Sequence, residues 1–479
     1  MHAIEQSLRR LYTAWSGKNI QSMLPIAQSG SDRKYFRLAD EDGQTAIGTY
    51  CENESENRAF IEMTQHFLTK KLPVPRLLAT KLEENIYLQE DLSDCALYQQ
   101  IPAQGQPFSD ELKNTYREVV TALARFQIQG NKGFDYAICY PLAEFGHRSM
   151  LWDLHYFKNF FLKLADIPFD EQGLEDDFEQ LITFLLQADC DYFMLRDCQS
   201  RNIMLKENKP YFIDYQGGRR GALQYDLASL LFQAKGNMPH SIREELLETY
   251  LDAAEQLTGI DRKIFTKHYY AYVLIRCLQA MGAYGFRGLY EKKEHFVTSI
   301  PFAIKNIAWW LDNVQLPFEM PHLRRALELT VLSKSRFEPY DKNLGKNSKL
   351  TVKIVSFSYK KGLPQDDSPN GGGFQFDCRA IENPGRYEQY KSLTGMDAPV
   401  IQFLEQQKTM TAFLQNSFAI IDASVENYIE RNFESLMVCF GCTGGQHRSV
   451  YSAEKLYAHL RNKYGINVQL CHREQGVAR

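Results

Sequence analysis

Near the middle of the chain stands Phe193-Met-Leu-Arg-Asp-Cys-Gln-Ser-Arg-Asn-Ile-Met-Leu205, followed shortly by Tyr211-Phe-Ile-Asp-Tyr-Gln216. Asp197 and Asn202 lie in a polar loop between two apolar segments, and Asp214 ends a third apolar segment. The order is therefore strand, polar loop, strand, turn, strand, acid. In a kinase-like phosphoryl-transfer site, one carboxylate orients and deprotonates a hydroxyl, while an Asn and a second carboxylate hold magnesium against ATP phosphates. We therefore predict Asp197 as the catalytic base and Asn202 and Asp214 as Mg²⁺ ligands.

The composition sets wide limits on the class of protein. With 479 residues, the chain is too long for one ordinary core, so two or three domains are expected. The net charge of −4 implies no bulk polyelectrolyte behaviour, and no apolar run approaches the length of a membrane span. The N-terminus resembles an amphipathic helix and not a signal peptide. The ten cysteines then read as reduced thiols, and we expect a cytoplasmic location without membrane contact.

Periodicity divides the first two thirds of the chain into a small sheet region and a large helical region. Residues 1–92 predict short strands with one helix, and residues 93–332 predict mostly helices around the catalytic loop. A sheet lobe followed by a helical lobe, with the site near their junction, predicts an α+β, protein-kinase-like bilobal domain. The expected strands are 35–38, 45–47 and 86–88, and the expected helices are 54–71, 109–129, 150–165, 174–187, 225–234, 241–258, 261–283 and 298–313.

The character of the sequence changes after residue 332. Residues 333–349 are polar and locally basic with little periodicity, which is typical of a solvated linker. Strands alternating with helices then predict a smaller α/β domain over residues 350–479. The expected strands are 350–357, 374–378, 436–440 and 468–470, and the expected helices are 398–432 and 448–464.

The first domain can be compared with known families through its motifs. Leu195-Arg-Asp-Cys-Gln-Ser-Arg-Asn202, Asp214-Tyr-Gln-Gly-Gly-Arg-Arg-Gly221 and Tyr225-Asp-Leu-Ala-Ser-Leu-Leu231 resemble the aminoglycoside-phosphotransferase and choline-kinase branch of the kinase fold. Within that branch, the sequence is most similar to anomeric kinases of N-acetylmuramate and N-acetylglucosamine. Ser31-Asp-Arg-Lys-Tyr-Phe-Arg37 and Leu88-Gln-Glu-Asp-Leu92 are similar to the phosphate-loop and hinge segments of that group.

This resemblance implies ATP and Mg²⁺ as cofactors and assigns further residues. Gln216 and Arg220 would lie near the acceptor sugar, and Asp226 would brace the catalytic loop. The residues implied in ATP binding are Arg33, Lys34, Arg37, Glu90 and Leu92.

Two departures from the family pattern stand out. Gln199 replaces the usual His, and the strand Thr45-Ala-Ile-Gly-Thr-Tyr50 lacks the lysine that pairs with ATP phosphates in kinases. Arg33, Lys34 or Arg37 are the candidates for that charge, and a weak or inactive kinase stays open as an alternative.

A second motif follows the apolar strand Leu436-Met-Val-Cys-Phe440. It reads Gly441-Cys-Thr-Gly-Gly-Gln-His-Arg-Ser449 and leads into a helix. Glycines let backbone amides approach an anion, and the helix N-terminus favours negative charge, so a phosphate-like ligand is expected. The Cys-x5-Arg-Ser spacing also fits cysteine phosphatases. Zinc is a weaker alternative through Cys439, Cys442, Cys471 and His472.

Residues 350–475 resemble the C-terminal domain of the RNase-adapter protein RapZ, through Gly441 to Val450 and through Phe376-Asp-Cys-Arg379, Asn383-Pro384 and Leu393-Thr-Gly-Met-Asp397. The resemblance implies binding of an amino-sugar phosphate, and it allows an RNA or protein partner. This chain differs from that family at Tyr359-Lys-Lys-Gly362 and at Gly385-Arg386, where the family often has His, and Lys361 is a candidate to contact the phosphate instead. The family's N-terminal P-loop motif is absent from the sequence. The implied binding residues are Asp377, Cys442, Thr443, Gly444, Gly445, His447 and Arg448.

Together these patterns predict an ATP-dependent sugar kinase of cell-wall recycling, joined to an amino-sugar-phosphate-sensing domain. Two other functions are kept open. One is a ligand-sensing regulator that binds RNA or protein and carries a degenerate kinase lobe. The other is a phosphotransferase acting on an aminoglycoside or choline-type acceptor.

Overall fold

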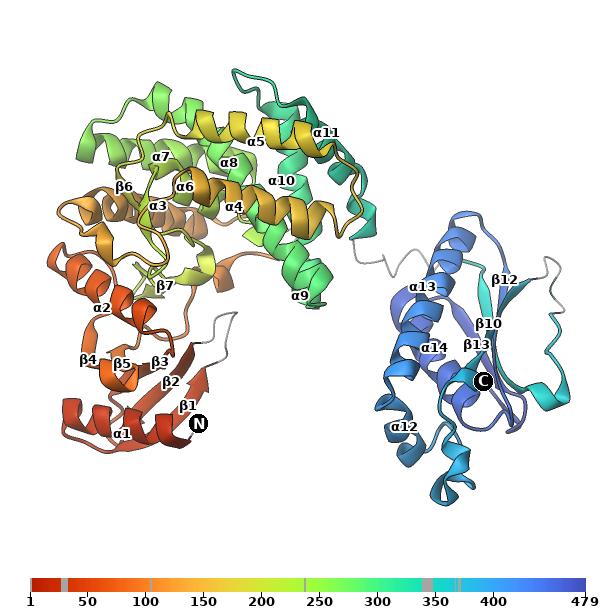
Figure 1. Cartoon of the computed structure of the whole chain (residues 1–479). Helices are drawn as coiled ribbons and strands as arrows, with labels where there is room; N and C mark the ends of the chain where they lie inside the picture. The colour runs from red at the N-terminus through yellow and green to blue at the C-terminus, as the bar shows by residue number, and fades with distance from the viewer. Residues whose placement is uncertain are drawn as a thin grey trace. The chain divides into compact units, whose positions relative to one another are not determined.

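The computed structural model describes residues 2–26, 33–103, 106–236, 238–337, 348–366, 368 and 372–479. The chain separates into two compact units, Met1–Glu338 and Pro339–Arg479, drawn from red to teal and from teal to blue in Figure 1. Of the predicted linker, residues 338–347 lie outside the described part, as do Ser31 and Asp32 of the predicted phosphate loop. Within the described residues, no helix is both long and apolar enough to cross a membrane.

The first lobe of unit 1 is a five-stranded antiparallel sheet in the order β1-β2-β3-β5-β4. Asn53 caps helix α2 by accepting a hydrogen bond from the Glu56 amide, as an N-terminal Asn commonly does. The three predicted strands and the predicted helix are present, whereas β1 and β4 were not predicted. The bounds are α1 His2–Ser16, β1 Ile20–Ile26, β2 Lys34–Asp40, β3 Thr45–Tyr50, α2 Glu54–Thr69, β4 Leu77–Lys81 and β5 Ile86–Glu90.

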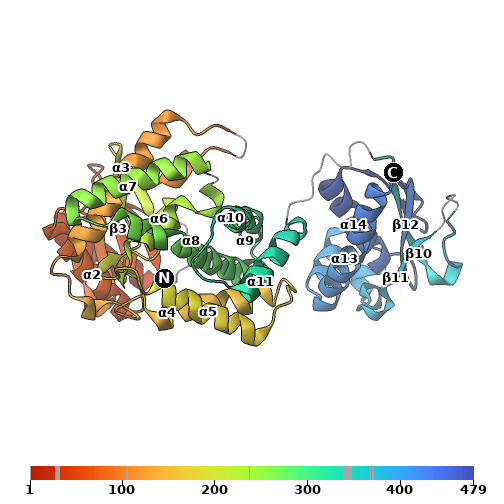
Figure 2. The same ribbon diagram turned by 90° about the horizontal axis from the view of Figure 1, so that it is seen from above.

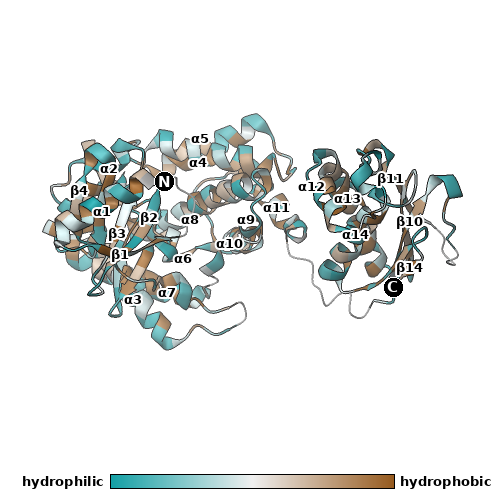
Figure 3. Cartoon of the chain, turned by 90° about the horizontal axis from the view of Figure 1, so that it is seen from below, coloured by the Kyte–Doolittle hydropathy of each residue, from teal (hydrophilic) through white to brown (hydrophobic). Residues whose placement is uncertain are grey.

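The second lobe of unit 1 is mostly helical, and its inner helices α8 and α10 are rich in buried apolar residues (Figure 3). Ser109, Asp170 and Asp261 cap α3, α5 and α8 with side-chain hydrogen bonds. The helices are α3 Asp110–Asn131, α4 His147–Phe157, α5 Glu171–Leu185, α6 Leu223–Leu231, α7 His240–Thr258, α8 Arg262–Tyr284, α9 Glu294–Val297, α10 Ile300–Asn313 and α11 Pro321–Leu332. Sheet lobe and helical lobe together confirm the predicted kinase-like bilobal fold.

One predicted helix differs in detail from the structure. Helix α4 begins at His147, earlier than predicted, and passes into a π-helical segment at Lys158–Leu162. A second π-helical segment, Gly285–Tyr290, continues α8. The two segments are packed so closely that a Cβ on Gly285 would stand 2.0 Å from the Phe160 carbonyl oxygen. The widened helical turn accompanies a backbone approach that only glycine permits.

Two short strand pairs carry the catalytic region between the helices. Strand β6 (Tyr192–Met194) pairs with β9 (Arg219–Gly221), and β7 (Ile203–Lys206) pairs with β8 (Lys209–Phe212). Glu207 and Asn208 join β7 to β8 with φ values of 53° and 60°, as the predicted tight hairpin requires.

Unit 2 is a five-stranded sheet in the order β11-β12-β10-β13-β14, parallel except for the last pair. Its helices lie on one face of the sheet (Figure 2). The predicted helical segment 398–432 is divided into two helices, so that Val400, Leu404 and Met410 all reach the same core. The bounds are β10 Thr351–Ser358, β11 Gly373–Asp377, α12 Ala398–Glu405, α13 Lys408–Glu430, β12 Ser435–Cys442, α14 Arg448–Tyr464, β13 Asn467–His472 and β14 Val477–Ala478.

Candidate active site

The catalytic loop is braced from behind by Asp226 of α6. Its carboxylate accepts hydrogen bonds from the backbone amides of Leu195 (2.7 Å) and Arg196 (3.0 Å) and from Nε2 of Gln127 (3.0 Å). Asp226 is fully buried, and this burial raises the pKa of its carboxyl group to about 7. Arg196 adopts a left-handed φ of 75°, so the chain turns sharply just before Asp197. The brace therefore fixes the direction in which Asp197 leaves β6.

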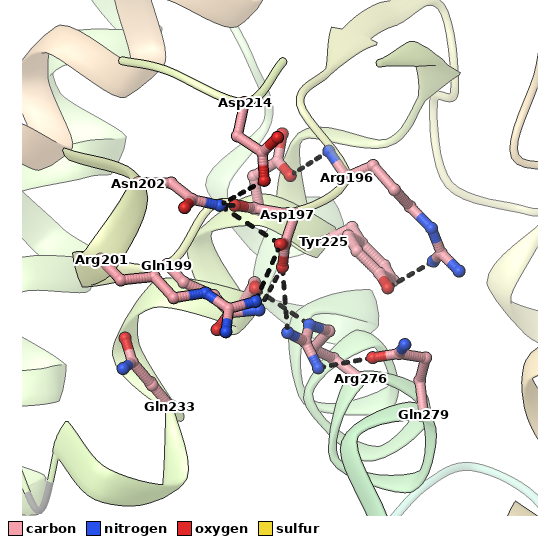
Figure 4. A network of polar contacts seen from close by, with 12 residues as sticks. Arg196, Asp197, Gln199, Arg201, Asn202, Asp214, Tyr225, Gln233, Arg276 and Gln279 are labelled. Atoms are coloured by element: carbon pink, nitrogen blue, oxygen red, sulfur yellow. Dashed lines mark hydrogen bonds and ion pairs between the residues drawn. The ribbon is translucent and has the colours of Figure 1, made fainter. Parts of the chain in front are cut away.

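The predicted triad meets at one amide group (Figure 4). Nδ2 of Asn202 lies 3.2 Å from Oδ2 of Asp197 and 3.3 Å from Oδ2 of Asp214. It also donates to the Asp197 carbonyl oxygen at 2.9 Å. Ile213 donates its backbone amide to the Asn202 carbonyl oxygen at 3.0 Å, and Asp214 then turns inward with a φ of 63°. Two carboxylates and an amide are thus gathered where a hard cation such as Mg²⁺ finds the oxygen ligands it prefers.

The Asp197 carboxylate is surrounded by nitrogen donors. Gln199 donates its amide to Oδ1, which shows how this residue takes part in the loop in place of the usual His. Nη2 of Arg201 lies 3.3 Å from Oδ2, and Nη2 of Arg276 lies 3.9 Å from Oδ1. In the described part of the chain, every side chain that contacts this carboxylate is an amide or a guanidinium.

Arg276 is the site residue that sequence reasoning missed. It comes from the middle of α8, where its neighbours in sequence are buried and apolar, and it is only 8% exposed. Its Nε donates to Oγ of Ser229 at 2.9 Å, and its Nη1 donates to Oε1 of Gln279 at 2.7 Å (Figure 4). A buried arginine on an apolar helix face is costly unless it is paired, and this was the one available signal.

The residues assigned to ATP lie around β2 and the end of β5. Arg33 is 2% exposed, and its Nη2 lies 3.3 Å from Oε2 of Glu56 in α2. Arg37 is held by Asp91 at 2.8 Å and by Asp94 at 2.7 Å, so its charge is already balanced. Of the candidates for the missing strand lysine, Arg33 is therefore the one paired to α2.

The other assigned residues of this region have separate surroundings. Nζ of Lys34 lies 5.9 Å from the ring centre of Tyr50. The Glu90 carboxylate bonds Lys206 at 2.6 Å and Arg76 at 3.1 Å. Leu92 is buried, and its backbone N–H and C=O form no hydrogen bond with any residue that the structure describes.

The two residues assigned to the acceptor have different surroundings. Gln216 belongs to the triad region, because its Nε2 donates to Oδ1 of Asp214 at 2.6 Å. Arg220 instead lies over the ring of Tyr136, 4.5 Å from its centre, with Nε 3.5 Å from Oδ1 of Asp191. The structure therefore brings Gln216, but not Arg220, into contact with the triad.

In unit 2, the loop between β12 and α14 closes around the sulfur of Cys442. Sγ accepts a hydrogen bond from the Gly445 amide at 3.2 Å and lies 3.1 Å from Oγ of Ser449. Burial acts to raise the pKa of this thiol, but the hydrogen bonds from Ser449 and Gln446 and the charge of Arg448 outweigh it and hold the pKa below its usual value. The loop is thus an anion-stabilising cradle with a thiol at its base.

The remaining residues assigned to this cradle are engaged elsewhere or form its rim. Nη1 of Arg448 donates to the carbonyl oxygens of Arg379 (3.0 Å) and Ile381 (2.7 Å). The guanidinium therefore holds the backbone segment that follows β11. Nε2 of His447 lies 2.8 Å from the Tyr390 carbonyl oxygen. Asp377 is paired with Arg379 at 2.7 Å, which holds its pKa below the usual value.

The glycine-rich rim has open space at Gly444. Thr443 accepts a hydrogen bond from Oγ of Ser358 at 2.8 Å through its carbonyl oxygen. A Cβ on Gly444 would meet no atom within 4 Å.

The geometry favours neither of the two alternatives to an anion cradle, a cysteine-phosphatase site and a zinc site. In the Cys-x5-Arg-Ser motif, Nη1 of Arg448 already donates to two backbone carbonyl oxygens instead of being left for a phosphate. For zinc, Cys439 packs in a different apolar cluster from Cys442, and no group of three or more His, Cys, Asp or Glu suited to a metal occurs among the described residues.

Residues 22–263, half of the chain, match the family described as "Phosphotransferase enzyme family". The chain belongs to this phosphotransferase family. Residues 350–476 match the RapZ C-terminal domain, so the family member carries that domain in its second unit.

The curated relatives of this phosphotransferase match between a quarter and a third of the chain. A "Nucleotide-binding protein" of Cupriavidus metallidurans is 41% identical over 139 residues, which is 29% of this chain and 45% of the relative. One of Endomicrobium trichonymphae is 38% identical over 125 residues, or 26% of this chain and 42% of the relative. The chain thus spans less than half the length of these relatives.

Similar solved structures come from small-molecule kinases. A choline kinase of Cryptosporidium parvum has a TM-score of 0.46 and 14% identity, covering 68% of this chain and 99% of that chain. A Plasmodium vivax ethanolamine kinase has a TM-score of 0.44 and 11% identity, covering 60% and 82%.

Proposed function

We propose that the protein is a kinase that transfers the γ-phosphoryl group of ATP to a hydroxyl of an N-acetylated amino sugar. The observation that carries this proposal is the meeting of Asp197, Asn202 and Asp214 at one amide group. The favoured acceptor is N-acetylmuramate or N-acetylglucosamine, phosphorylated at the anomeric hydroxyl during recycling of cell-wall sugars. We further propose that the protein works in the cytoplasm.

In this mechanism, Asp197 accepts a hydrogen bond from the acceptor hydroxyl and takes its proton as the new P–O bond forms. The bond between the γ-phosphorus and the β,γ-bridging oxygen of ATP breaks, and ADP leaves with that oxygen. Asn202 and Asp214 would hold Mg²⁺, which when bound would neutralise charge on the ATP phosphates. Arg201, 3.3 Å from Asp197, has the charge and reach to stabilise the transferring phosphoryl group. Gln216 orients Asp214 from the acceptor side through its 2.6 Å hydrogen bond.

On the ATP side, Arg33 replaces the missing strand lysine. It is buried, and its pairing with Glu56 gives the link between the sheet and α2 that positions a phosphate-binding cation in kinases. The unused backbone donor and acceptor of Leu92 suit the edge of adenine. Lys34 and Glu90 stay secondary candidates, and Arg37 is more useful in fixing the chain after β5 through Asp91.

The charges around Asp197 favour a sugar over a cationic acceptor. An aminoglycoside or choline brings positive charge to the site, and it would be repelled by Arg201 and Arg276. An N-acetylated sugar is neutral or, with a lactyl group, anionic. The second alternative, a phosphotransferase for amine-bearing acceptors, is therefore the less favoured one.

For unit 2 we propose binding of an amino-sugar phosphate in the Cys442 cradle. Backbone amides at a helix N-terminus suit a phosphate, and the assignment rests on the domain match and on the donors that converge there. Thr443, Gly444 and Gly445 would line the phosphate, while Asp377, His447 and Arg448 would shape the surrounding chain. In this view the domain senses a metabolite, and an RNA or protein partner is a further hypothesis.

The test is a turnover assay with Mg²⁺ and ATP over a panel of N-acetylated sugars, aminoglycosides and choline. We expect turnover on an N-acetylated sugar and a loss of at least about 10³-fold in Asp197→Asn. Asp312→Asn, an exposed carboxylate far from the catalytic loop in sequence, is the control and should match the wild type. Full turnover in Asp197→Asn would remove the assigned mechanism. No turnover on any acceptor, together with salt-sensitive RNA binding, would favour the regulator with a degenerate kinase lobe.

A further inference from the structure

A second concave site lies on unit 1, away from the triad. It is a groove of about 740 Å³ whose lining includes none of Asp197, Asn202 and Asp214. Three segments form its walls: the end of α2 with the loop after it, one side of α3, and β8. We call it the α2–α3 groove. Glu90, a secondary candidate for ATP binding, is one of its lining residues, but neither the proposed reaction nor the family assignment gives the groove itself a role.

The floor of the α2–α3 groove is apolar. Leu72, Val74 and Pro210 are buried beneath it, and Ala122 of α3 is partly exposed to it. A groove with an apolar floor and a volume in the range of 300–1,000 Å³ is typical of a site for one small molecule.

The rim of the groove carries more positive than negative charge. Five cationic side chains line it, against the two acidic side chains Glu90 and Glu118. Arg76 is paired with Glu90, and Arg117 is paired with Glu245 of α7. The other three cations make no ion pair with a described residue, and they are Lys71, Arg125 and Lys209. Cations without an ion-pair partner, placed around an apolar floor, are complementary to a ligand that is both apolar and negatively charged.

The walls of the groove belong to both lobes. Phe212 of β8 donates its backbone amide to the Pro73 carbonyl oxygen at 2.8 Å, which joins the loop after α2 to the helical lobe. The Glu90 carboxylate at the end of β5 reaches Lys206 of β7 at 2.6 Å. A molecule held in the groove would therefore touch the sheet lobe and the helical lobe at once and restrain their junction.

We propose that the α2–α3 groove is a second ligand site, which takes a small organic anion with an apolar body. The apolar body would cover the floor at Leu72 and Val74, and the acidic group would meet Lys71, Arg125 or Lys209. The proposal does not depend on the acceptor or on turnover, because it concerns a site that shares no lining residue with the triad.

Two matched fluorescent probes test this proposal on the full chain. Anilinonaphthalene sulfonate has an apolar body with an acidic group, and phenylnaphthylamine has nearly the same body without it. We expect the sulfonate to bind the wild type at least about tenfold more tightly than the amine. In Lys71→Ala/Arg125→Ala/Lys209→Ala this preference should fall to within about twofold. These three side chains are exposed, so the variant should keep its fold.

A charge-matched control removes three other exposed cations, in Arg148→Ala/Lys292→Ala/Lys305→Ala, and should bind both probes as the wild type does. Ala122→Trp fills the groove without changing its charge and should weaken both probes. Bound sulfonate should also slow hydrogen exchange at the Phe212 amide, which locates it at the junction of the lobes.

Three outcomes would overturn the proposal. One is equal sulfonate affinity in the wild type and in both triple variants. Another is unchanged binding in Ala122→Trp. The third is displacement of the sulfonate by polyglutamate at a lower carboxylate concentration than by naphthoate, which would assign the groove to an acidic protein segment instead.

Discussion

Nη2 of Arg276 in α8 lies 3.9 Å from Oδ1 of Asp197 in the catalytic loop. The arginine is held by Ser229 and Gln279, and Asp197 is the one carboxylate it pairs with among the described residues. The Asp197 carboxylate also accepts hydrogen bonds from the side chains of Gln199, Arg201 and Asn202, so it is fixed from several sides. Arg276 thus acts on the reaction through Asp197, as a positioning residue.

Replacing this cation tests its positioning role. We expect Arg276→Met to lower kcat by about 10²-fold with little change in the KM for ATP, because the nucleotide side of the site keeps its contacts. Arg276→Lys should recover part of the lost kcat, since it restores the positive charge but not the planar set of N–H donors of a guanidinium. Arg148→Met is the control for removal of an exposed arginine. A rise in the KM for ATP with kcat unchanged would contradict the role given to Arg276.

The brace at Asp226 predicts a pH-dependent stability. Burial raises the folded-state pKa of this carboxyl group to about 7, above the value of an unfolded Asp, so the folded state binds the extra proton between about pH 4 and 7. The stability contributed by this group is therefore fully present below about pH 4 and is lost as the pH rises through 7. The free energy of unfolding of the wild type, minus that of Asp226→Asn, should increase as the pH falls from about 7 to 4.

The other carboxylates contribute equally to the free energy of unfolding of the wild type and of Asp226→Asn, so their contributions cancel in the difference. The slope cannot exceed about 1.4 kcal/mol per pH unit for a single proton. Denaturant unfolding at a series of pH values measures it. A difference that stays constant from pH 4 to 8, or grows as the pH rises, would contradict the predicted shift.

The pair Arg33–Glu56 predicts how ATP is held without a strand lysine. Arg33→Met should raise the KM for ATP by about tenfold or more, because a buried phosphate-side cation is lost. Glu56→Gln should have a smaller effect in the same direction, because it removes the carboxylate partner and keeps the arginine with its hydrogen bond to the carbonyl oxygen of residue 56. Arg58→Met is the matched control, because Arg58 is an exposed arginine of α2 that is paired with Glu54. Equal KM values in Arg33→Met and Arg58→Met would contradict the assignment.

The sequence was most informative where the pattern is local. Asp197, Asn202 and Asp214 are set by two adjacent loops, so their spacing alone predicted that they meet. Helix α14 was predicted with its observed bounds, because a glycine-rich loop precedes it and Gly465 ends it in a left-handed conformation. Strands β1 and β4 were missed because they lie at the edges of their sheet, where β1 contains Pro25 and neither strand alternates cleanly.

Contacts between segments that are distant in sequence could not be predicted from local sequence patterns. Arg276 reaches Asp197 only because α8 packs against α6, and the sequence marks it only as an arginine on an apolar helix face, without naming its partner. The contacts of Arg220 are a second example. Pairing of β9 with β6 places it over the ring of Tyr136 and near Asp191, which the sequence did not predict. Its role toward the acceptor stays a prediction.

The thiol at the base of the cradle in unit 2 predicts a measurable titration. Oγ of Ser449 lies 3.1 Å from Sγ of Cys442 and stabilises the thiolate, so Ser449→Ala should raise the pKa of this thiol. The pH dependence of alkylation at Cys442, followed by mass spectrometry, measures the change. Ser452→Ala is the control, because that hydroxyl bonds the Arg448 carbonyl oxygen instead. The same midpoint in Ser449→Ala and the wild type would contradict the prediction.

Two adjacent glycines of the cradle offer a matched pair for the proposed anion site. Gly445 has a φ of +65°, and a Cβ there would stand 2.4 Å from Cγ of Glu474 and 2.9 Å from the Ser358 amide nitrogen, whereas a Cβ on Gly444 would meet nothing within 4 Å. Gly445→Ala should therefore displace the loop and cost about 1–3 kcal/mol of stability, while Gly444→Ala should cost less than about 1 kcal/mol. Binding of glucosamine phosphate, measured by calorimetry, should be lost in Gly445→Ala and kept within about tenfold in Gly444→Ala. If both variants bound the ligand as the wild type does, the cradle would not be its site.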